Sequence, residues 1–231
     1  QFFAVRDSTP TQALNEVSLD VRAGEFVCLI GPSGCGKTTL MHLLAGFVKP
    51  TAGAVRFRGE PVRGPGPERG VVFQEYALFP WMTARQNVEF GLRALKVDAG
   101  ERKRRALQAL ERVHLSHAAD RYPNELSGGM RQRIAVARSL VVEPQVLLMD
   151  EPFAAVDAMT RASLQNDLLR LWQETGVSVL FVTHNIDEAI FLAQRVVVMA
   201  AHPGSIRADI AIELPYPRQR GSLEFAQHYA E

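Results

Sequence analysis

The apolar positions of the chain recur at two spacings, and these predict an alternation of strands and helices. Four short apolar runs are typical of buried strands, namely "EFVCLI", "PQVLLMDEP", "VSVLFVTH" and "RVVVMAA". Elsewhere apolar residues recur three or four positions apart, which predicts a helix packed on a core, as at Leu164, Leu168, Leu171 and Trp172. Strands separated by helices in this order predict a parallel α/β core.

The remaining segments are expected to extend this core. Short strands are expected over residues 13–30 and twice within residues 51–73, at "GAVRFRG" and "GVVFQ". Residues 75–143 are expected to form an inserted, mostly helical lobe. A helix is predicted after "VSVLFVTH", with Asn185 and Glu188 placed for a capping box at its start. "RVVVMAA" is expected to be the last strand, and the tail that follows it to be peripheral.

The first candidate site is the stretch "LIGPSGCGKTTLMHLLAG", where a predicted strand meets a predicted helix. Its glycines allow the backbone to turn tightly and to aim successive N–H groups at a phosphate chain. The following helix adds the positive end of its dipole. Lys37 is expected to reach the β- and γ-phosphates, and the Thr38 hydroxyl to ligate Mg²⁺. The pattern G-x-x-x-x-G-K-[ST] is matched in full by Gly31, Pro32, Ser33, Gly34, Cys35, Gly36, Lys37 and Thr38.

A glycine-rich turn beside a surface lysine is the simpler interpretation of this stretch. The strand predicted before it and the helix predicted after it favour the nucleotide site. The phosphate loop alone is compatible with several classes of protein, including kinases, GTPases and motors.

Two acids follow the apolar run "VLLM". Asp150 is expected to hold Mg²⁺ directly or through water, and Glu151 to polarise the attacking water. An exposed acidic turn after a strand is the alternative. The complete phosphate loop earlier in the chain favours the catalytic interpretation.

A second anion-binding helix start is predicted in "ELSGGMRQRIAVARSL". Ser127, Gly128 and Gly129 leave the first turn of this helix short of bulky side chains. An ordinary N-cap with a flexible approach is the alternative. One phosphate loop cannot easily share a γ-phosphate with both helix starts of the same chain, so a second copy of the chain is indicated.

Composition and charge narrow the class of protein. The chain has 231 residues and a formal net charge of +1, from 26 basic and 25 acidic residues, which does not indicate nucleic acid as a partner. Cys28 lies in a predicted buried strand and Cys35 in the phosphate loop, so we expect no disulfide and a reducing compartment. No apolar run reaches the length of a membrane span.

Taken in order, the motifs resemble those of the ATP-binding subunit of an ATP-binding cassette (ABC) transporter, over roughly residues 13–215. "GPSGCGKT" resembles the Walker A motif, "LSGGM" the signature, "VLLMDE" the Walker B motif and "AAVD" the D-loop. Gln74 in "VVFQ" resembles the Q-loop glutamine, and His184 in "VTHN" the switch histidine.

The resemblance implies a single ABC ATPase domain over residues 1–231. Its fold is a P-loop (RecA-like) parallel sheet core with an antiparallel β subdomain and an inserted helical subdomain. The core with its β subdomain is expected over 1–74 and 144–201, the helical subdomain over 75–143, and a C-terminal tail over 202–231.

The resemblance also implies a role for each motif in binding and hydrolysing ATP with Mg²⁺. Glu151 would be the general base, and His184 would contact the γ-phosphate and the attacking water. Gln74 would sense Mg²⁺, and Thr39 would touch the α-phosphate. Two chains would pack head to tail, with the Walker A motif of one facing Ser127, Gly128 and Gly129 of the other. Asp157 would communicate across this dimer.

The sequence departs from the family pattern at several positions. Met130 stands where the signature usually has glutamine, which removes a possible ribose contact, although Gln132 is nearby. The D-loop reads "AAVD", where serine or glycine and leucine are commoner. The candidates for the aromatic residue that stacks on adenine are Phe2 and Phe3.

Finer resemblance points to importers of the nitrate, sulfonate and taurine group, on the stretches "GPGPERGVVFQEYALFPW", "QNVEFGL", "LWQETG" and "HNIDEAIFLAQRVVVM". Such a subunit lies on the cytoplasmic face of the prokaryotic inner membrane. It binds a separate transmembrane permease and acts indirectly with an extracytoplasmic solute-binding protein. Docking of the permease is expected around Tyr76, Leu78, Phe79 and Trp81, for which packing within the helical lobe is the alternative.

Three other functions remain open from the sequence. One is a soluble ABC ATPase of DNA repair or translation, although the chain has no long coiled-coil insertion or second cassette. Another is a nucleotide-gated binding module with little turnover, which the intact set Lys37, Asp150, Glu151 and His184 disfavours. The third is an exporter subunit, which the importer-like stretches disfavour.

Overall fold

The computed structural model describes residues 12–230, which form two compact units. Of the described residues, the first unit contains 12–66 and 178–230, and the second contains 67–177. The chain leaves the first unit and returns to it, so the second unit is an insertion between two parts of the first.

The first unit is built on four adjacent strands, in the order β6 (Ser178–Val182), β1 (Phe26–Ile30), β7 (Arg195–Ala200) and β8 (Ser205–Ala211). β1 pairs in parallel with both β6 and β7, and β8 pairs antiparallel with β7. All five residues of β6 are buried, as are the first four of β1. Strands covered on both faces read as continuous apolar runs, which is why the sequence shows them clearly.

Three helices and a short hairpin complete the first unit: α1 (Lys37–Ala45), α6 (Ile186–Leu192), α7 (Leu223–Ala230), and the antiparallel pair β2 (Arg56–Phe57) and β3 (Glu60–Pro61). α6 packs on β1, and α7 packs on α6. α1 follows β1 directly through the phosphate loop.

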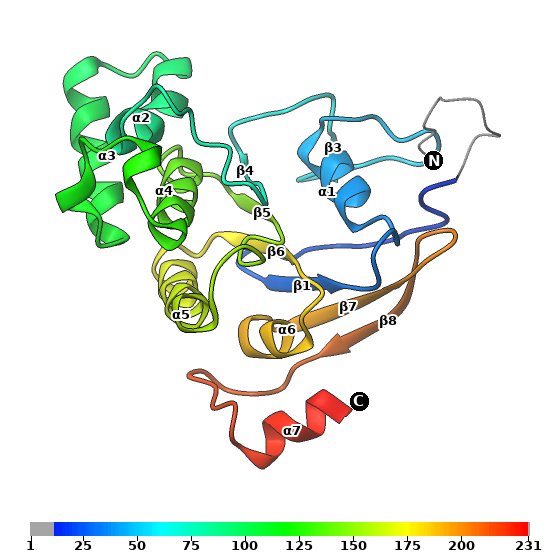
Figure 1. Ribbon diagram of the computed structural model, residues 1–231. Helices are drawn as coiled ribbons and strands as arrows, with labels where there is room; N and C mark the ends of the chain where they lie inside the picture. The colour runs from blue at the N-terminus through cyan, green and yellow to red at the C-terminus, as the bar shows by residue number, and fades with distance from the viewer. Residues whose placement is uncertain (1–11, 231) are drawn as a thin grey trace. The chain divides into compact units, whose positions relative to one another are not determined.

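The second unit contains one parallel strand pair and four helices. The strands are β4 (Arg69–Val72) and β5 (Val146–Asp150), and the helices are α2 (Ala84–Ala94), α3 (Ala99–Arg112), α4 (Gly128–Leu140) and α5 (Ala158–Thr175). Two short 3₁₀ turns, Ser116–Ala118 and Pro123–Glu125, precede α4. α2, α3 and α4 pack on one another, and α4 also contacts β4 and α5 (Figure 1). Thr83 and Gln86 form a reciprocal capping box at the start of α2.

The predicted fold class is confirmed, since both units are mixed α/β with parallel pairs and a separate antiparallel pair. Two local expectations are wrong. Residues 13–25 form no regular strand, only an isolated bridge between Leu14 and Gly204. The tail supplies a further strand, β8, and the helix α7. β8 was not predicted because it is an edge strand with one solvated face, and Arg207 and Asp209 interrupt its apolar pattern.

The tail is also anchored by Arg218, whose side chain is only 7% exposed. Its guanidinium donates hydrogen bonds to four backbone carbonyls, those of Ile190, Ala193, Ile212 and Leu214. Two of these carbonyls lie at the end of α6, where helical carbonyls have no partner within the helix. Burial lowers the pKa of Arg218, and the Tyr216 ring lies 4.3 Å from its guanidinium carbon.

We expect Arg218→Met to lower the free energy of unfolding by about 2–4 kcal/mol, because it leaves several buried carbonyls without a donor. Urea unfolding measures the change. Arg220→Met is the matched control, since Arg220 makes a partly exposed ion pair with Asp187, and it should cost about 1 kcal/mol or less. Equal losses in the two variants would contradict the role given to Arg218.

Candidate functional site

The phosphate loop turns between β1 and α1 through backbone positions that require glycine. Gly34 and Gly36 have φ of +79° and +92°, in the left-handed region that side chains disfavour. A Cβ on Gly36 would lie 2.6 Å from Cδ2 of Leu14, whereas a Cβ on Gly34 would meet nothing within 4 Å. The loop is therefore held tightly against the segment before β1, and it is open at Gly34.

Lys37 begins α1, and its side chain is held by the loop itself. Its Nζ donates to the carbonyls of Gly31 at 2.8 Å and Pro32 at 3.0 Å, and lies 3.7 Å from Sγ of Cys35. The residue is only 6% exposed, and no carboxylate among the described residues pairs with it. A buried ammonium with neutral partners is poised to bind an anion.

The register of the first unit places His184 at the same sheet edge as the phosphate loop. Leu29 of β1 lies opposite Val182 of β6, so the residues after both strands leave in the same direction. The intervening Thr183 is buried, and its hydroxyl donates to the Glu188 carboxylate at 2.6 Å. His184 itself is exposed.

The predicted helix start at Asn185 is only half confirmed. Asn185 is the N-cap of α6, and its side chain accepts from the Glu188 amide at 3.2 Å. The reciprocal bond of a capping box is replaced, because the Glu188 carboxylate accepts from Thr183. This bond ties the helix start to the end of β6.

The second unit brings Asp150, Glu151 and Gln74 to one edge of its strand pair. Val72 near the end of β4 lies opposite Met149 of β5, so the turn that carries Gln74 and the acids that end β5 emerge together. Asp150 is 8% exposed, and Glu151 has a φ of +42°. A non-glycine residue in this region is strained, which is common where a side chain is held for function.

The signature and the D-loop meet within the second unit. Ser127 is the N-cap of α4 and accepts from the Met130 amide at 3.3 Å. Asp157 is the N-cap of α5 and accepts from the Thr160 amide at 2.9 Å. A Cβ on Gly129 would lie 2.5 Å from Cγ2 of Thr160, so the two helix starts are in contact. Hydrogen bonds from the Thr160 hydroxyl and backbone lower the pKa of Asp157.

The segment after Gln74 is fixed by two residues that the sequence analysis missed. Arg138 of α4 donates to the carbonyls of Tyr76 and Ala77, both of which have positive φ. Asn87 of α2 binds the backbone of Phe79 in both directions, at 2.8 and 3.2 Å. Their only signal in the sequence is a polar residue within an apolar helical face, which does not reveal the distant partner.

An aromatic surface follows from this arrangement. Trp81 is 69% exposed and Phe90 is 41% exposed. The centroid of the Phe79 ring lies 5.7 Å from that of Trp81 and 4.5 Å from that of Phe90. Leu78 is half-buried. We call these four residues the aromatic surface; packing within the lobe accounts for Phe79 but leaves most of Trp81 uncovered.

Gln132 cannot replace the missing signature glutamine. Its side chain is fully buried, and neither of its polar atoms has a hydrogen-bond partner among the described residues. It therefore points into the unit rather than toward a nucleotide outside it. Phe2 and Phe3 lie outside the described residues. Cys28 and Cys35 are both buried and free, as expected.

The chemistry of the site fits ATP and Mg²⁺. An open loop of glycines, a helix of nine residues behind it and a lysine that pairs with no acid among the described residues suit a phosphate chain. In the first unit the Thr38 hydroxyl, and in the second unit the Asp150 carboxylate, are each an oxygen ligand of the kind that Mg²⁺ prefers.

The comparisons with known proteins identify the class. The family model described as ABC transporter matches residues 14–154, which is more than half of the chain. The chain therefore belongs to the ABC transporter family and is an ABC ATPase that binds ATP.

Among curated proteins, it is 49% identical over 217 residues to an ABC transporter ATP-binding protein of Methanocaldococcus jannaschii, covering 94% of this chain and 81% of that protein. It is 49% identical over 203 residues to the nitrate import ATP-binding protein NrtD of Synechocystis sp., covering 88% and 76%. The NrtD of Synechococcus elongatus is 45% identical over 226 residues, covering 96% and 82%.

The chain is also similar to solved structures of ATP-binding cassettes. A dimer of the ATP-binding cassette MJ0796 in a post-hydrolysis state, bound to ADP and Pi, aligns with a TM-score of 0.80 at 31% identity, covering 92% of this chain and 96% of that chain. CbiO1 of Clostridium perfringens, part of the transporter complex cbiONQ, aligns with a TM-score of 0.81 at 29% identity, covering 90% and 86%.

Because Gly129 and Thr160 are in contact, a substitution at Thr160 should restore the stability lost by a substitution at Gly129. Gly129→Ala should lower the free energy of unfolding by about 1–2 kcal/mol, because overpacking outweighs the gain in helix propensity. Thr160→Ser removes the clashing methyl group and keeps the hydroxyl. Urea unfolding of the double variant Gly129→Ala/Thr160→Ser should therefore recover most of the loss, and additive effects would show that the two residues do not meet.

Proposed function

We propose that this chain is the ATP-hydrolysing subunit of an importer that carries nitrate, taurine or another sulfonate through a separate permease. The phosphate loop, with its buried Lys37 free of any acidic partner among the described residues, is the observation that carries the nucleotide chemistry. The similarity to nitrate import ATP-binding proteins supports the importer class. Of the described residues, none belongs to a helix long and apolar enough to cross a membrane.

The phosphate loop would bind the triphosphate through its backbone N–H groups. Lys37 exchanges its two carbonyl partners for the β- and γ-phosphates, which are stronger acceptors because they are charged. Thr39 is the third residue of α1, in its first turn, and would reach the α-phosphate. Thr38 and Asp150 would hold Mg²⁺, which neutralises charge on the phosphates as the γ-phosphate leaves.

Glu151 would accept a proton from the attacking water as general base. Its positive φ holds the carboxylate in an orientation that a relaxed backbone would not keep. His184 would orient the water and the γ-phosphate, and the bond from Thr183 to Glu188 holds the adjacent helix start in place. Gln74 would sense the metal from its exposed turn.

Two copies of the chain would form the complete site. The first turn of α4, with Ser127, Gly128 and Gly129, would face the γ-phosphate bound by the partner subunit. Asp157 would lie at the boundary between the two. The dimeric cassettes among similar structures support this arrangement. Binding of ATP would then favour the closed dimer over the open one, and hydrolysis would reverse that preference.

The aromatic surface would contact the permease at the cytoplasmic face of the inner membrane. Arg138 links the backbone after Gln74 to α4, and α4 begins at the signature. Movement at the nucleotide would thus reach Trp81 through hydrogen-bonded and packed elements. An extracytoplasmic solute-binding protein would deliver the solute to the permease.

Glu151→Gln should retain ATP binding and lower the rate of phosphate release by at least about a hundredfold, because the general base is lost. Phosphate release and nucleotide binding are measured on the same preparation. Glu174→Gln, an exposed acid on α5, is the control and should hydrolyse ATP normally. Normal turnover by Glu151→Gln would refute the assignment of the base.

Trp81→Ala should abolish co-purification with a multi-span permease while leaving basal ATP hydrolysis within about twofold, because the exposed ring is a binding anchor. The tagged chain is recovered from gently solubilised membranes of its native cell. Tyr122→Ala removes another exposed aromatic side chain of the second unit and should keep the permease. Recovery of soluble partners alone by the unaltered chain would favour a non-transport ABC ATPase.

A further inference from the structure

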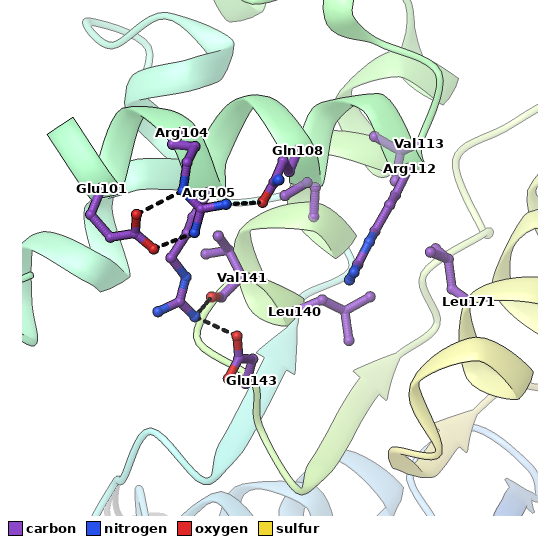
Figure 2. A pocket seen from close by; sticks show the side chains of 12 residues that line it. Glu101, Arg104, Arg105, Gln108, Arg112, Val113, Leu140, Val141, Glu143 and Leu171 are labelled. Atoms are coloured by element: carbon purple, nitrogen blue, oxygen red, sulfur yellow. Dashed lines mark hydrogen bonds and ion pairs between the residues drawn. The ribbon is translucent and has the colours of Figure 1, made fainter.

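A hollow of about 190 Å³ lies on the outside of the second unit, beside α3 and the end of α4 (Figure 2). No residue to which we assign a part in ATP hydrolysis lines it. Its size is of the order of an engineered cavity of ~150 Å³ that holds benzene, so a small organic molecule fits.

The floor of the hollow is apolar. Val113, Val141 and Leu171 are buried there, and Leu140 and Ala109 are half-buried. These side chains come from α3, α4 and α5 and from the residues just beyond two of those helices. A ligand with a short hydrocarbon body would cover the parts of Leu140 and Ala109 that are still exposed to water.

The rim carries more positive than negative charge. Arg104 is paired with Glu101, at 2.7 Å from its Nε, and Arg105 with Glu143, also at 2.7 Å. The Glu143 side chain is 81% exposed, and that of Glu101 is 41% exposed. Such exposed pairs are weak and can be exchanged for another anion at little cost.

Arg112 is the rim cation that pairs with no acid among the described residues. Its guanidinium makes no hydrogen bond or ion pair with any residue in the described part of the chain, and Figure 2 shows it extending along the hollow toward Leu140. Arg105 meanwhile donates to the carbonyl of Val141, at 2.8 Å, which partly offsets the negative end of α4. Arg170 likewise donates to the carbonyl of Arg112 at the end of α3, at 2.8 Å, so the negative ends of both helices oppose an anion beside Arg112 less strongly.

We propose that this hollow binds a small organic anion, with its charged group against Arg112 and its apolar body on the floor. An inorganic anion would use the arginines and leave the exposed part of the floor, at Leu140 and Ala109, in water. A neutral apolar molecule would cover the floor but leave Arg112 without a partner. Organic anions are the class of ligand that matches both Arg112 and the apolar floor. The proposal does not depend on which solute the transporter carries.

Isothermal titration of the full chain, with its phosphate loop saturated by ADP so that no anion binds there, tests the proposal with three probes: 1-hexanesulfonate, sulfate and 1-hexanol. We expect 1-hexanesulfonate to bind about tenfold more tightly than either of the others, because it alone uses charge and floor together. Equal affinity for 1-hexanol, equal affinity for sulfate, or no binding of 1-hexanesulfonate would each overturn the proposal.

Two variants locate the binding. Arg112→Gln should weaken 1-hexanesulfonate about tenfold, and Lys103→Gln, an exposed cation of α3 outside the hollow, should not. Ala109→Gln fills the hollow without changing charge and should also block binding. Unfolding midpoints in urea show whether each variant is folded. Unchanged affinity in folded Arg112→Gln or Ala109→Gln would refute the site, and ATP hydrolysis, measured in parallel, tests the catalytic assignment separately.

Discussion

The register between β1 and β6 sets Leu29 opposite Val182, and much of the candidate site in the first unit depends on this pairing. Parallel strands end at the same edge of a sheet, so the phosphate loop after β1 and His184 after β6 leave from that edge together. The pairing of Val72 with Met149 does the same for Gln74 and Asp150 in the second unit. A shift of one residue in either register would also turn buried side chains toward the opposite face, so burial protects the geometry of the site.

Cations in this chain are repeatedly held by backbone carbonyls rather than by acids. Lys37 binds two carbonyls of the phosphate loop and Arg138 two after Gln74. Arg218 binds two at the end of α6 and two in the tail. A carbonyl satisfies a buried donor without cancelling its charge. At Arg138 and Arg218 the result is structural, because the carbonyls belong to a helix end or to irregular segments, where they need a donor. At Lys37 it leaves the positive charge available to phosphate.

The sequence predicted those features that are encoded locally. The phosphate loop, the acids after "VLLM" and the helix starts at Ser127 and Asn185 are inferred from neighbouring residues, and the buried strands from continuous apolar runs. β8 was missed because an edge strand with a solvated face has no such run. Arg138, Asn87 and Arg218 were missed because each acts on a backbone segment distant in sequence or within an irregular tail, and only the folded chain shows which carbonyls they reach. The position of Gln132 near Met130 in the sequence likewise does not show which side of the helix its side chain occupies.

The contact of Gly129 with Thr160 suggests how the starts of α4 and α5 divide their roles. Both helix N-termini carry partial positive charge, and they lie against each other. Asp157 places a carboxylate, whose pKa is lowered by hydrogen bonds from Thr160, at the start of α5. The start of α4 has only the neutral hydroxyl of Ser127, so its positive end is not cancelled by its own cap. In the proposed dimer, the helix start that keeps its charge is the one that would face the γ-phosphate of the partner subunit. The start of α5, already bearing an anion, is suited to contact protein instead.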